Sequence, residues 1–329
     1  MSTLSFKNVY INSTYTIVGK LEYNGPLKKY FHAHFEDPYL NQKTFEQAEM
    51  SMIKHCIHGV LKRNKTKEKD ISVCFGGDLS NQIACSNHAL KEFSFPFVGV
   101  YGACSTSMLS LGLASIFVDK NKGKALSYSA SFNQTSEKQF RFPNEYGVQK
   151  KPCTTFTASG CGASIVSNTK SDIRVKNFTI GRIIDSYQSD VNDLGGAMSL
   201  AALDTLSKHL KNTSTTSKDY DLILTGDLSK EGSEILKSIA IYDGIDLSKN
   251  YNDCGLLIYD LETQDVYAGG SGCACCAVVT YSYVIDLLKN KKIKNCLIIA
   301  TGALFSPSSF NQEKTIPTIA HAITLEVVE

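Results

Sequence analysis

The sequence of 329 residues lacks the features that would place it across or outside a membrane. A transmembrane helix needs about 20 consecutive apolar residues, and the longest apolar runs here, residues 111–118 and 296–305, are far shorter. The opening residues, MSTLSFKNVYINS, do not combine a charged start with an apolar stretch, as a secretory signal peptide does. We therefore expect neither a transmembrane helix nor a signal peptide.

The sequence also lacks an excess of charge of either sign. The 34 Lys and Arg residues nearly balance the 32 Asp and Glu residues, which gives a net charge of +2. A nucleic-acid-binding protein usually shows a basic excess or a basic stripe, so we expect no nucleic-acid partner. Two short basic stretches, residues 62–69 and 289–294, are interpreted as solvated helix ends, with contact to an anionic lipid surface as the alternative.

A disulfide framework is absent too, although the chain has 11 cysteines. Their number is odd, their spacing is irregular, and a chain of this length does not need covalent cross-links, so we expect reduced thiols in a cytosol-like compartment. Cys273 and Cys276 form one Cys-x-x-Cys pair without a second pair at ligand spacing. We interpret both as small residues packed in a buried helix, and we predict no metal site.

The sequence does contain a repeated unit. Two apolar, β-rich runs end in Gly-Asp-Leu-Ser, at residues 77–80 and 226–229. Each is followed by a helical segment and then by a predicted strand, which is residues 95–101, a buried strand, in the first copy and residues 254–259 in the second. A helix with small residues on nearly every face comes next, and it begins near Gly102 in the first copy and near Gly272 in the second. A helix that is apolar all round is buried. The pattern predicts a layered α/β fold of two similar halves, residues 1–175 and 176–329.

The turn into the first buried helix carries a cysteine, in the sequence GACSTSM. A cysteine between a buried strand and a buried helix resembles the nucleophile position of the thiolase and ketoacyl synthase superfamily. The N-terminus of a helix lowers the pKa of a thiol placed there. The resemblance implies a thiolase-like fold of duplicated α/β units, with layers in the order αβαβα and two buried central helices.

The chain resembles one branch of that superfamily more closely, the stage V sporulation protein AD family of spore-forming bacteria. Six motifs carry this resemblance: YGACSTSM, EKQFRFPNEYG, DYDLILTGDLSK, DCGLLIYD, ATGALFSPSSF and IPTIAHAI. It implies binding of dipicolinic acid, free or as its calcium chelate, and uptake of this molecule into the developing spore together with membrane proteins of the same spore channel. It also implies a cytoplasmic protein, peripheral on the forespore membrane, with no cofactor other than calcium carried by the ligand.

The second half lacks the side chains that thiolase chemistry needs. The superfamily places a His after the first strand of that half and a His or Asn before the second buried helix. Here those places hold Thr225-Gly226-Asp227 and Gly269-Gly270-Ser271. A carboxylate near Cys104 raises the pKa of its thiol. We therefore interpret Cys104 as a vestigial nucleophile in a non-catalytic protein; the alternatives are an active acyl-CoA condensing enzyme using Cys104 and a structural coupling protein with a vestigial pocket.

Dipicolinate is a flat pyridine with two carboxylates, which cations and the N–H groups at a helix start can bind. Cys104 and Ser105 open the first buried helix, where they either face the ligand or serve tight packing. Arg141, Tyr146 and Lys150 come from the loop QFRFPNEYGVQK, which is either a ligand-binding loop or a dimer-interface loop.

Two further candidates have structural alternatives. Asp227 either faces the ligand or, like Asp78, caps the helix that follows it. His321 is either a ligand contact or a structural imidazole in the final strand. Phe132 stands where relatives often have His, so this chain could bind the ligand differently or more weakly. We also predict a homodimer through the strand ALSYSAS (residues 125–131), taken as an exposed edge strand.

Overall fold

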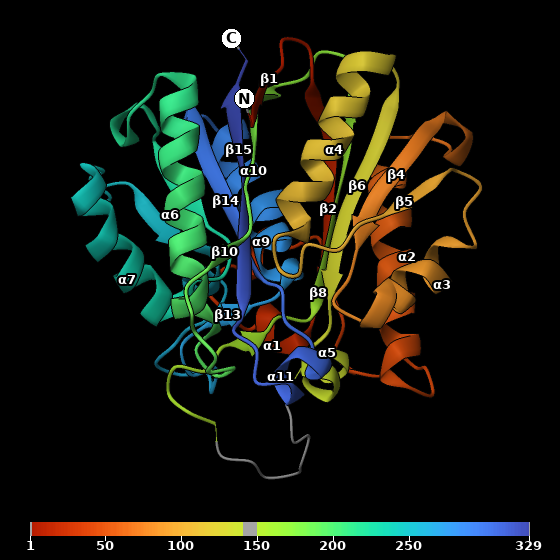
Figure 1. Cartoon of the computed structure of the whole chain (residues 1–329). Coiled ribbons are helices and arrows are strands. Elements are labelled where there is room, and N and C mark those ends of the chain that lie inside the picture. Colours follow the sequence, from red (N-terminus) through yellow and green to blue (C-terminus); the bar gives the residue numbers. More distant parts are fainter. Residues whose placement is uncertain (1, 141–149, 329) are drawn as a thin grey trace.

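A large mixed sheet runs through the molecule, and its two parts repeat the same strand order (Figure 1). The computed structural model describes residues 2–140 and 150–328. The first part has the order β5-β4-β6-β8-β2 and the second the order β12-β11-β14-β15-β9. The strands of the first part are β2 (Tyr10–Val18), β4 (Ile71–Gly77), β5 (Phe97–Gly99), β6 (Lys124–Ser131) and β8 (Gly160–Ser167). Those of the second are β9 (Ile173–Ile180), β11 (Leu222–Thr225), β12 (Tyr251–Asp253), β14 (Asn295–Ala303) and β15 (Pro317–Val327).

The two parts also repeat the strand directions. In the first, β4 is parallel to β5 and β6, while β8 is antiparallel to β6 and β2. In the second, β11 is parallel to β12 and β14, while β15 is antiparallel to β14 and β9. The parts meet where Tyr10 of β2 pairs with Arg174 of β9. The chain is therefore a duplicated α/β unit. The boundary predicted between residues 175 and 176 falls inside β9 and remains a prediction.

Helices form three layers around and between the two parts of the sheet (Figure 1). One outer layer holds α2 (Phe45–Arg63) and α3 (Ala84–Leu90), and the other holds α6 (Leu194–Thr213) and α7 (Ser229–Ala240). Between the sheets lie α4 (Thr106–Asn121) and α9 (Cys273–Val279), which continues through residues 280–284 into α10 (Ile285–Lys289). The predicted αβαβα order with two central helices is confirmed.

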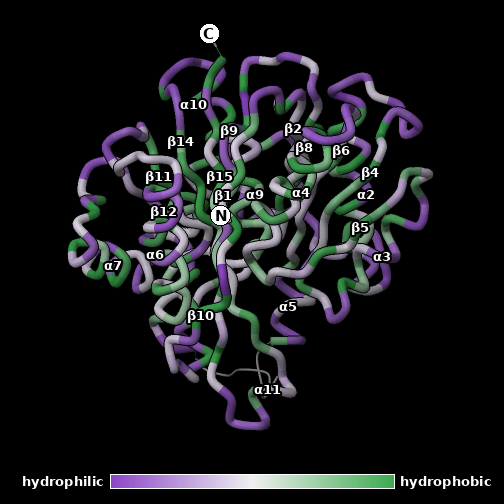
Figure 2. Tube along the Cα trace, turned by 45° about the horizontal axis from the view of Figure 1, so that its top comes forward, coloured by the Kyte–Doolittle hydropathy of each residue, from purple (hydrophilic) through white to green (hydrophobic). Residues whose placement is uncertain are grey.

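The central helices pack closely because they carry small residues. A Cβ added to Gly112 of α4 would lie 2.3 Å from the ring of Phe178 in β9, and one added to Gly162 of β8 would lie 2.9 Å from Ala277 of α9. Cys273 is fully buried, and its thiol donates a hydrogen bond to the carbonyl of Ala130. Hydrophobic segments accordingly concentrate on α9, β14 and β15, and hydrophilic ones on the outer loops (Figure 2).

Three predictions about strands were wrong. Residues 254–257 form the short helix α8 (Cys254–Leu257), because the side chain of Asp253 accepts a hydrogen bond from the backbone N–H of Gly255 and caps it. The run 95–101 forms only the short β5 at the sheet edge, where Val98 is 43% exposed, so it is not a buried strand. The strand ALSYSAS, in β6, lies between β4 and β8 and is buried, so the exposed edge of the first part is β5 instead.

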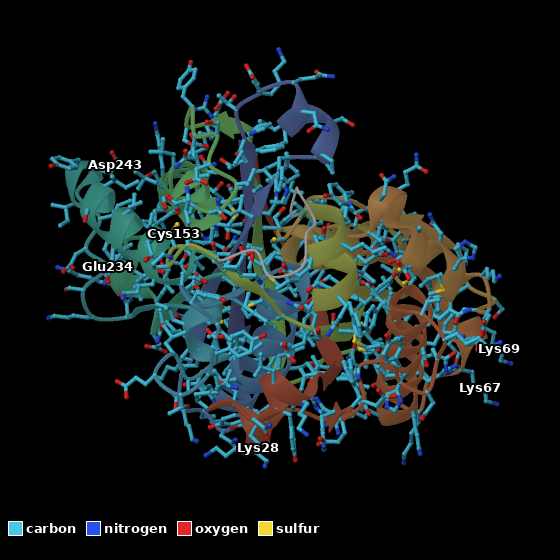
Figure 3. All side chains as sticks on the ribbon, turned by 90° about the horizontal axis from the view of Figure 1, so that it is seen from below. Lys28, Lys67, Lys69, Cys153, Glu234 and Asp243 are labelled. Atoms are coloured by element: carbon cyan, nitrogen blue, oxygen red, sulfur yellow. The ribbon has the colours of Figure 1, made fainter. Side chains whose placement is uncertain are left out.

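The remaining strands and α-helices are short. They are β1 (Thr3–Ser5), β3 (Ala33–His34), β7 (Phe156–Thr157), β10 (Ile184–Asp185), β13 (Gly270–Ser271), α1 (Lys20–Tyr23), α5 (Asn133–Phe140) and α11 (Pro307–Asn311). Within residues 2–140 and 150–328, none of the helices has the length and apolar character required to cross a bilayer. All 11 cysteines are free thiols. In the basic stretch 62–69, Lys67 and Lys69 project outward at the edge of the molecule (Figure 3).

Candidate functional site

A narrow cavity of about 50 Å³ lies beside Cys104, where the two halves of the chain meet α5. Most of its wall is apolar, and the apolar residues are Leu79, Ala103, Phe140, Val191, Leu194, Met198, Ala303 and Phe305. The hydroxyl groups of Ser136, Thr154, Thr155, Thr157 and Ser271 add polar positions. The cavity has room for a few water molecules, so a larger ligand requires its wall to open.

The turn that presents Cys104 is fixed by local hydrogen bonds. The Thr106 hydroxyl accepts a hydrogen bond from the Gly102 N–H and donates one to the Ala103 carbonyl, and Ala103 takes a left-handed conformation with φ 48°. The Ser105 hydroxyl donates to the Gly102 carbonyl at 2.6 Å, and Ser105 is fully buried. Cys104 is therefore the partly exposed residue of the pair, and the side chain of Ser105 holds the turn together.

Asp227 lies behind Cys104 in a fully hydrogen-bonded position. Its carboxylate accepts hydrogen bonds from the Ser271 hydroxyl (2.9 Å), the Gly272 N–H (3.0 Å) and the Thr301 hydroxyl (2.7 Å). The Ser271 oxygen is in turn 3.9 Å from the sulfur of Cys104. A row of thiol, hydroxyl and carboxylate thus runs from the cavity into the core.

The two Gly-Asp-Leu-Ser copies place their aspartates differently. Asp78 accepts a hydrogen bond from the Ser86 N–H in the first turn of α3, as predicted for a cap. For Asp227, the capping alternative is wrong, because Asp253 accepts the hydrogen bonds from the N–H groups of Leu228 and Ser229 at the start of α7. The Asp227 carboxylate therefore faces Cys104 instead of the helix that follows it.

The surroundings of Cys104 disfavour a thiolate. Burial, and then the negative charge of Asp227, raise the pKa of the Cys104 thiol well above its usual value. Burial also raises the pKa of Asp227. The thiolate is the nucleophilic form, so at neutral pH Cys104 is held as a protonated, weakly nucleophilic thiol.

Imidazole groups lie elsewhere. All seven histidines belong to the described part of the chain, and none of them lines the cavity. His321 is buried in β15, where its Nδ1 accepts a hydrogen bond from the Gly181 N–H at 3.3 Å, and burial lowers its pKa to about 4. The structure therefore does not bring His321 to Cys104.

The cation Lys150 lies next to the cavity without lining it. Its Nζ is 3.3 Å from the carboxylate of Glu137, which does line the cavity, and 5.7 Å from the ring centre of Tyr267. The other two predicted loop residues, Arg141 and Tyr146, lie outside the described residues. Phe132 is fully buried and stacks on Phe35 with 5.8 Å between ring centres, away from the cavity lining.

Sequence reasoning missed several lining residues. Ser136, Glu137 and Phe140 come from α5, and Phe305 follows β14; the rings of Phe140 and Phe305 are 5.6 Å apart. These positions fall in or beside the motifs EKQF and ATGALFSP. Those motifs were the available signal, because they bring residues from both halves to one place.

Comparison with known proteins assigns the family. The family model described as Stage V sporulation protein AD (SpoVAD) matches residues 1–326. The chain belongs to this family. Stage V sporulation protein AD of Bacillus subtilis (strain 168) is 43% identical over 319 residues, which cover 97% of this chain and 94% of that relative.

Solved structures show the fold that the family shares. 3-Oxoacyl-[acyl-carrier-protein] synthase III from Aquifex aeolicus VF5 covers 97% of this chain and 99% of its own, with 13% identity and a TM-score of 0.56. A variant of Xanthomonas campestris OleA covers 97% of this chain and 99% of its own, with 11% identity and a TM-score of 0.63. The thiolase-like fold is therefore confirmed. At these identities the similarity extends to the fold alone.

Proposed function

We propose that this sporulation protein binds dipicolinic acid without catalysing a reaction, and that it helps to move this molecule into the developing spore. In this proposal it acts on the cytoplasmic face of the forespore membrane, together with membrane proteins of the same spore channel. Family membership supports a role in sporulation, and the cavity beside Cys104 supports ligand binding without catalysis.

The observation that carries the non-catalytic part is the carboxylate of Asp227 beside Cys104. Acyl transfer to a thiol needs a base to take the thiol proton and donors to hold the thioester oxygen. Asp227 raises the pKa of the thiol, and its own oxygens are already occupied by Ser271, Gly272 and Thr301. The carboxylate behind the thiol therefore opposes formation of the nucleophile.

The cavity offers contacts that suit a flat aromatic dicarboxylate. Phe140 and Phe305 contribute aromatic rings to the cavity lining, and Ala103 and Cys104, in the turn before α4, also line it. Lys150 supplies positive charge next to the cavity, where it forms an ion pair with Glu137. Glu137 supplies a carboxylate that could complete the oxygen shell of a chelated calcium ion. Because the cavity is small, we expect the two phenylalanine rings to separate when the ligand enters.

Alkylation of Cys104 tests whether the ligand occupies this cavity. The full chain is treated with iodoacetamide, with and without dipicolinate and calcium, and peptide mass spectrometry follows each thiol. We expect dipicolinate to slow the modification of Cys104 and to leave Cys153 unchanged, since Cys153 is partly exposed but does not line the cavity (Figure 3). Equal rates at Cys104 with and without saturating ligand would exclude binding at this site.

One observation favours the acyl-transfer alternative. The Ser271 hydroxyl lies between the Cys104 thiol and Asp227, so it could pass the thiol proton to the carboxylate. Incubation with acetyl-CoA and malonyl-CoA separates the two functions. A stable acyl adduct on Cys104 would establish the enzyme, whereas the binding proposal predicts an unchanged mass.

We further propose that the chain forms a homodimer through the edge of β5. Val98 in β5 and Tyr101, two residues beyond its end, are each 43% exposed, although both are large and apolar or aromatic. An unpaired edge strand of this kind is a template for pairing with a second chain. A second copy joined edge to edge would cover both residues and continue the sheet.

A further inference from the structure

Three side chains that could bind a metal ion meet in the first half of the chain, and none of them lines the Cys104 cavity. They are Glu49 of α2, Asp78 after β4 and Cys85 of α3. One oxygen or sulfur atom from each lies within 4.8 Å of the other two. Glu49 and Asp78 are fully buried, and Cys85 is 1% exposed.

The two carboxylates have no cationic partner within residues 2–140 and 150–328. Among the described residues, no Lys, Arg or His forms an ion pair with Glu49 or Asp78. Two buried carboxylates this close repel each other unless a proton or a cation lies between them.

The hydrogen bonds position these side chains but leave ligand atoms free. Asp78 accepts from the N–H groups of Ser80 and Ser86, and one oxygen of Glu49 accepts from the Thr135 hydroxyl at 2.7 Å. The other oxygen of Glu49, Oε1, is buried and makes no hydrogen bond to any described residue. The Ser86 hydroxyl, on the residue whose N–H binds Asp78, is also buried and without a partner in the described part of the chain. Unsatisfied polar atoms in a core require an explanation.

We propose that Glu49, Asp78 and Cys85 bind a divalent transition-metal ion with the chemistry of Zn²⁺. A thiolate with two carboxylates is a ligand set that zinc accepts, and tetrahedral zinc leaves a fourth position for the Ser86 hydroxyl or a water molecule. The thiolate disfavours Ca²⁺ and Mg²⁺, which bind oxygen ligands. The ion supplies the positive charge that the two carboxylates lack, and it displaces the proton of the Cys85 thiol.

The location gives this site a structural role next to the cavity. Its ligands connect α2, α3 and the end of β4, and Thr135 of α5 holds Glu49. Leu79 and Ser136, the neighbours of Asp78 and Thr135 in the chain, line the Cys104 cavity. A bound ion would therefore fix the wall of the cavity from behind.

Metal titration of the full chain tests the proposal. After treatment with a chelator, the protein is titrated with Zn²⁺ by calorimetry and with Co²⁺ by absorption spectroscopy. We expect one ion per chain, a sulfur-to-cobalt charge-transfer band, and no competition by Ca²⁺. Cys85→Ser should abolish the band, and Glu49→Gln should weaken binding by at least about 100-fold. The matched controls Glu22→Gln and Cys296→Ser, at a buried carboxyl and a buried thiol outside the cluster, should bind as the parent does.

Thermal unfolding separates metal binding from misfolding. Glu49→Gln keeps the side-chain shape and cannot ionise beside Asp78, so the chelator-treated variant should be at least as stable as the parent. Zn²⁺ should then raise the melting temperature of the parent and not that of the variant. Failure of the parent to take up stoichiometric Zn²⁺ would overturn the proposal and leave a proton shared between the carboxylates. Equal affinity in Cys85→Ser would overturn it as well.

Discussion

Replacing Asp227 with Asn tests whether this carboxylate keeps Cys104 protonated. The amide can retain the local hydrogen bonds, because its oxygen can accept from the Ser271 hydroxyl and the Gly272 N–H. Its NH₂ group can then donate to the Thr301 hydroxyl, which accepts this hydrogen bond instead of donating one. We therefore expect a stability loss of only about 1–2 kcal/mol. The negative charge beside the thiol disappears.

The size of the effect on the thiol follows from Coulomb's law. Two unit charges about 4 Å apart near a protein surface interact by about 4 kcal/mol. The cavity is open to water on one side, so we take about half of this value. An interaction of about 2 kcal/mol corresponds to a fall of about 1.5 units in the pKa of the Cys104 thiol. The thiolate fraction then rises about 30-fold, but a thiolate of lower pKa is less nucleophilic, so the net gain in alkylation rate is about five- to ten-fold.

The assay is the rate of Cys104 alkylation by iodoacetamide between pH 7 and pH 9, followed by peptide mass spectrometry in the parent and in Asp227→Asn. The rate at Cys153 serves as the internal reference, because Cys153 is partly exposed and not part of this row of side chains. We expect faster modification of Cys104 in the variant across this range. An unchanged or slower rate at Cys104 would refute the claim that Asp227 suppresses the thiolate.

Three further predictions concern the packing, the pH dependence and the assembly. Gly112→Ala should destabilise the protein by about 1–3 kcal/mol in chemical denaturation, because the new methyl group would meet the ring of Phe178. Burial lowers the pKa of His209 to about 4, below the value of about 6.5 in the unfolded chain. The unfolded state therefore binds more protons between these values. As the pH falls from 6.5 to 4, the free energy of unfolding of the parent should decrease by up to about 3 kcal/mol more than that of His209→Gln. Val98→Lys at the edge of β5 should convert a dimer to a monomer in light scattering, and an unaltered mass would argue against pairing through this edge.

The duplication and the central helices could be predicted from the sequence because they depend on local patterns. The two Gly-Asp-Leu-Ser steps each follow a strand, β4 and β11, and the small residues of GACSTSM and CACCAVV occupy the closely packed centre. The Cys104 turn could also be located, because a turn into a buried helix leaves a recognisable mixture of small residues.

The differing roles of Asp78 and Asp227 could not be predicted, because their partners come from distant parts of the chain. The same tetrapeptide faces Glu49 in one half and the Ser271–Thr301 pair in the other. The edge position of β5 was missed for a related reason. An apolar run appears buried in sequence, whereas its position in the sheet depends on which strands pair beside it. The roles of Arg141 and Tyr146 remain predictions.

Calorimetric titration of the full chain with dipicolinate, with and without calcium, tests the central claim most directly. The account predicts saturable binding of one ligand per chain, which Cys104→Ser leaves intact because the backbone N–H groups remain. Lys150→Gln and Arg141→Ala should each weaken binding roughly ten- to a hundred-fold, as expected for the loss of a charge-assisted contact. Absence of binding under both conditions, or loss of binding in Cys104→Ser with Arg141→Ala unaffected, would contradict the account.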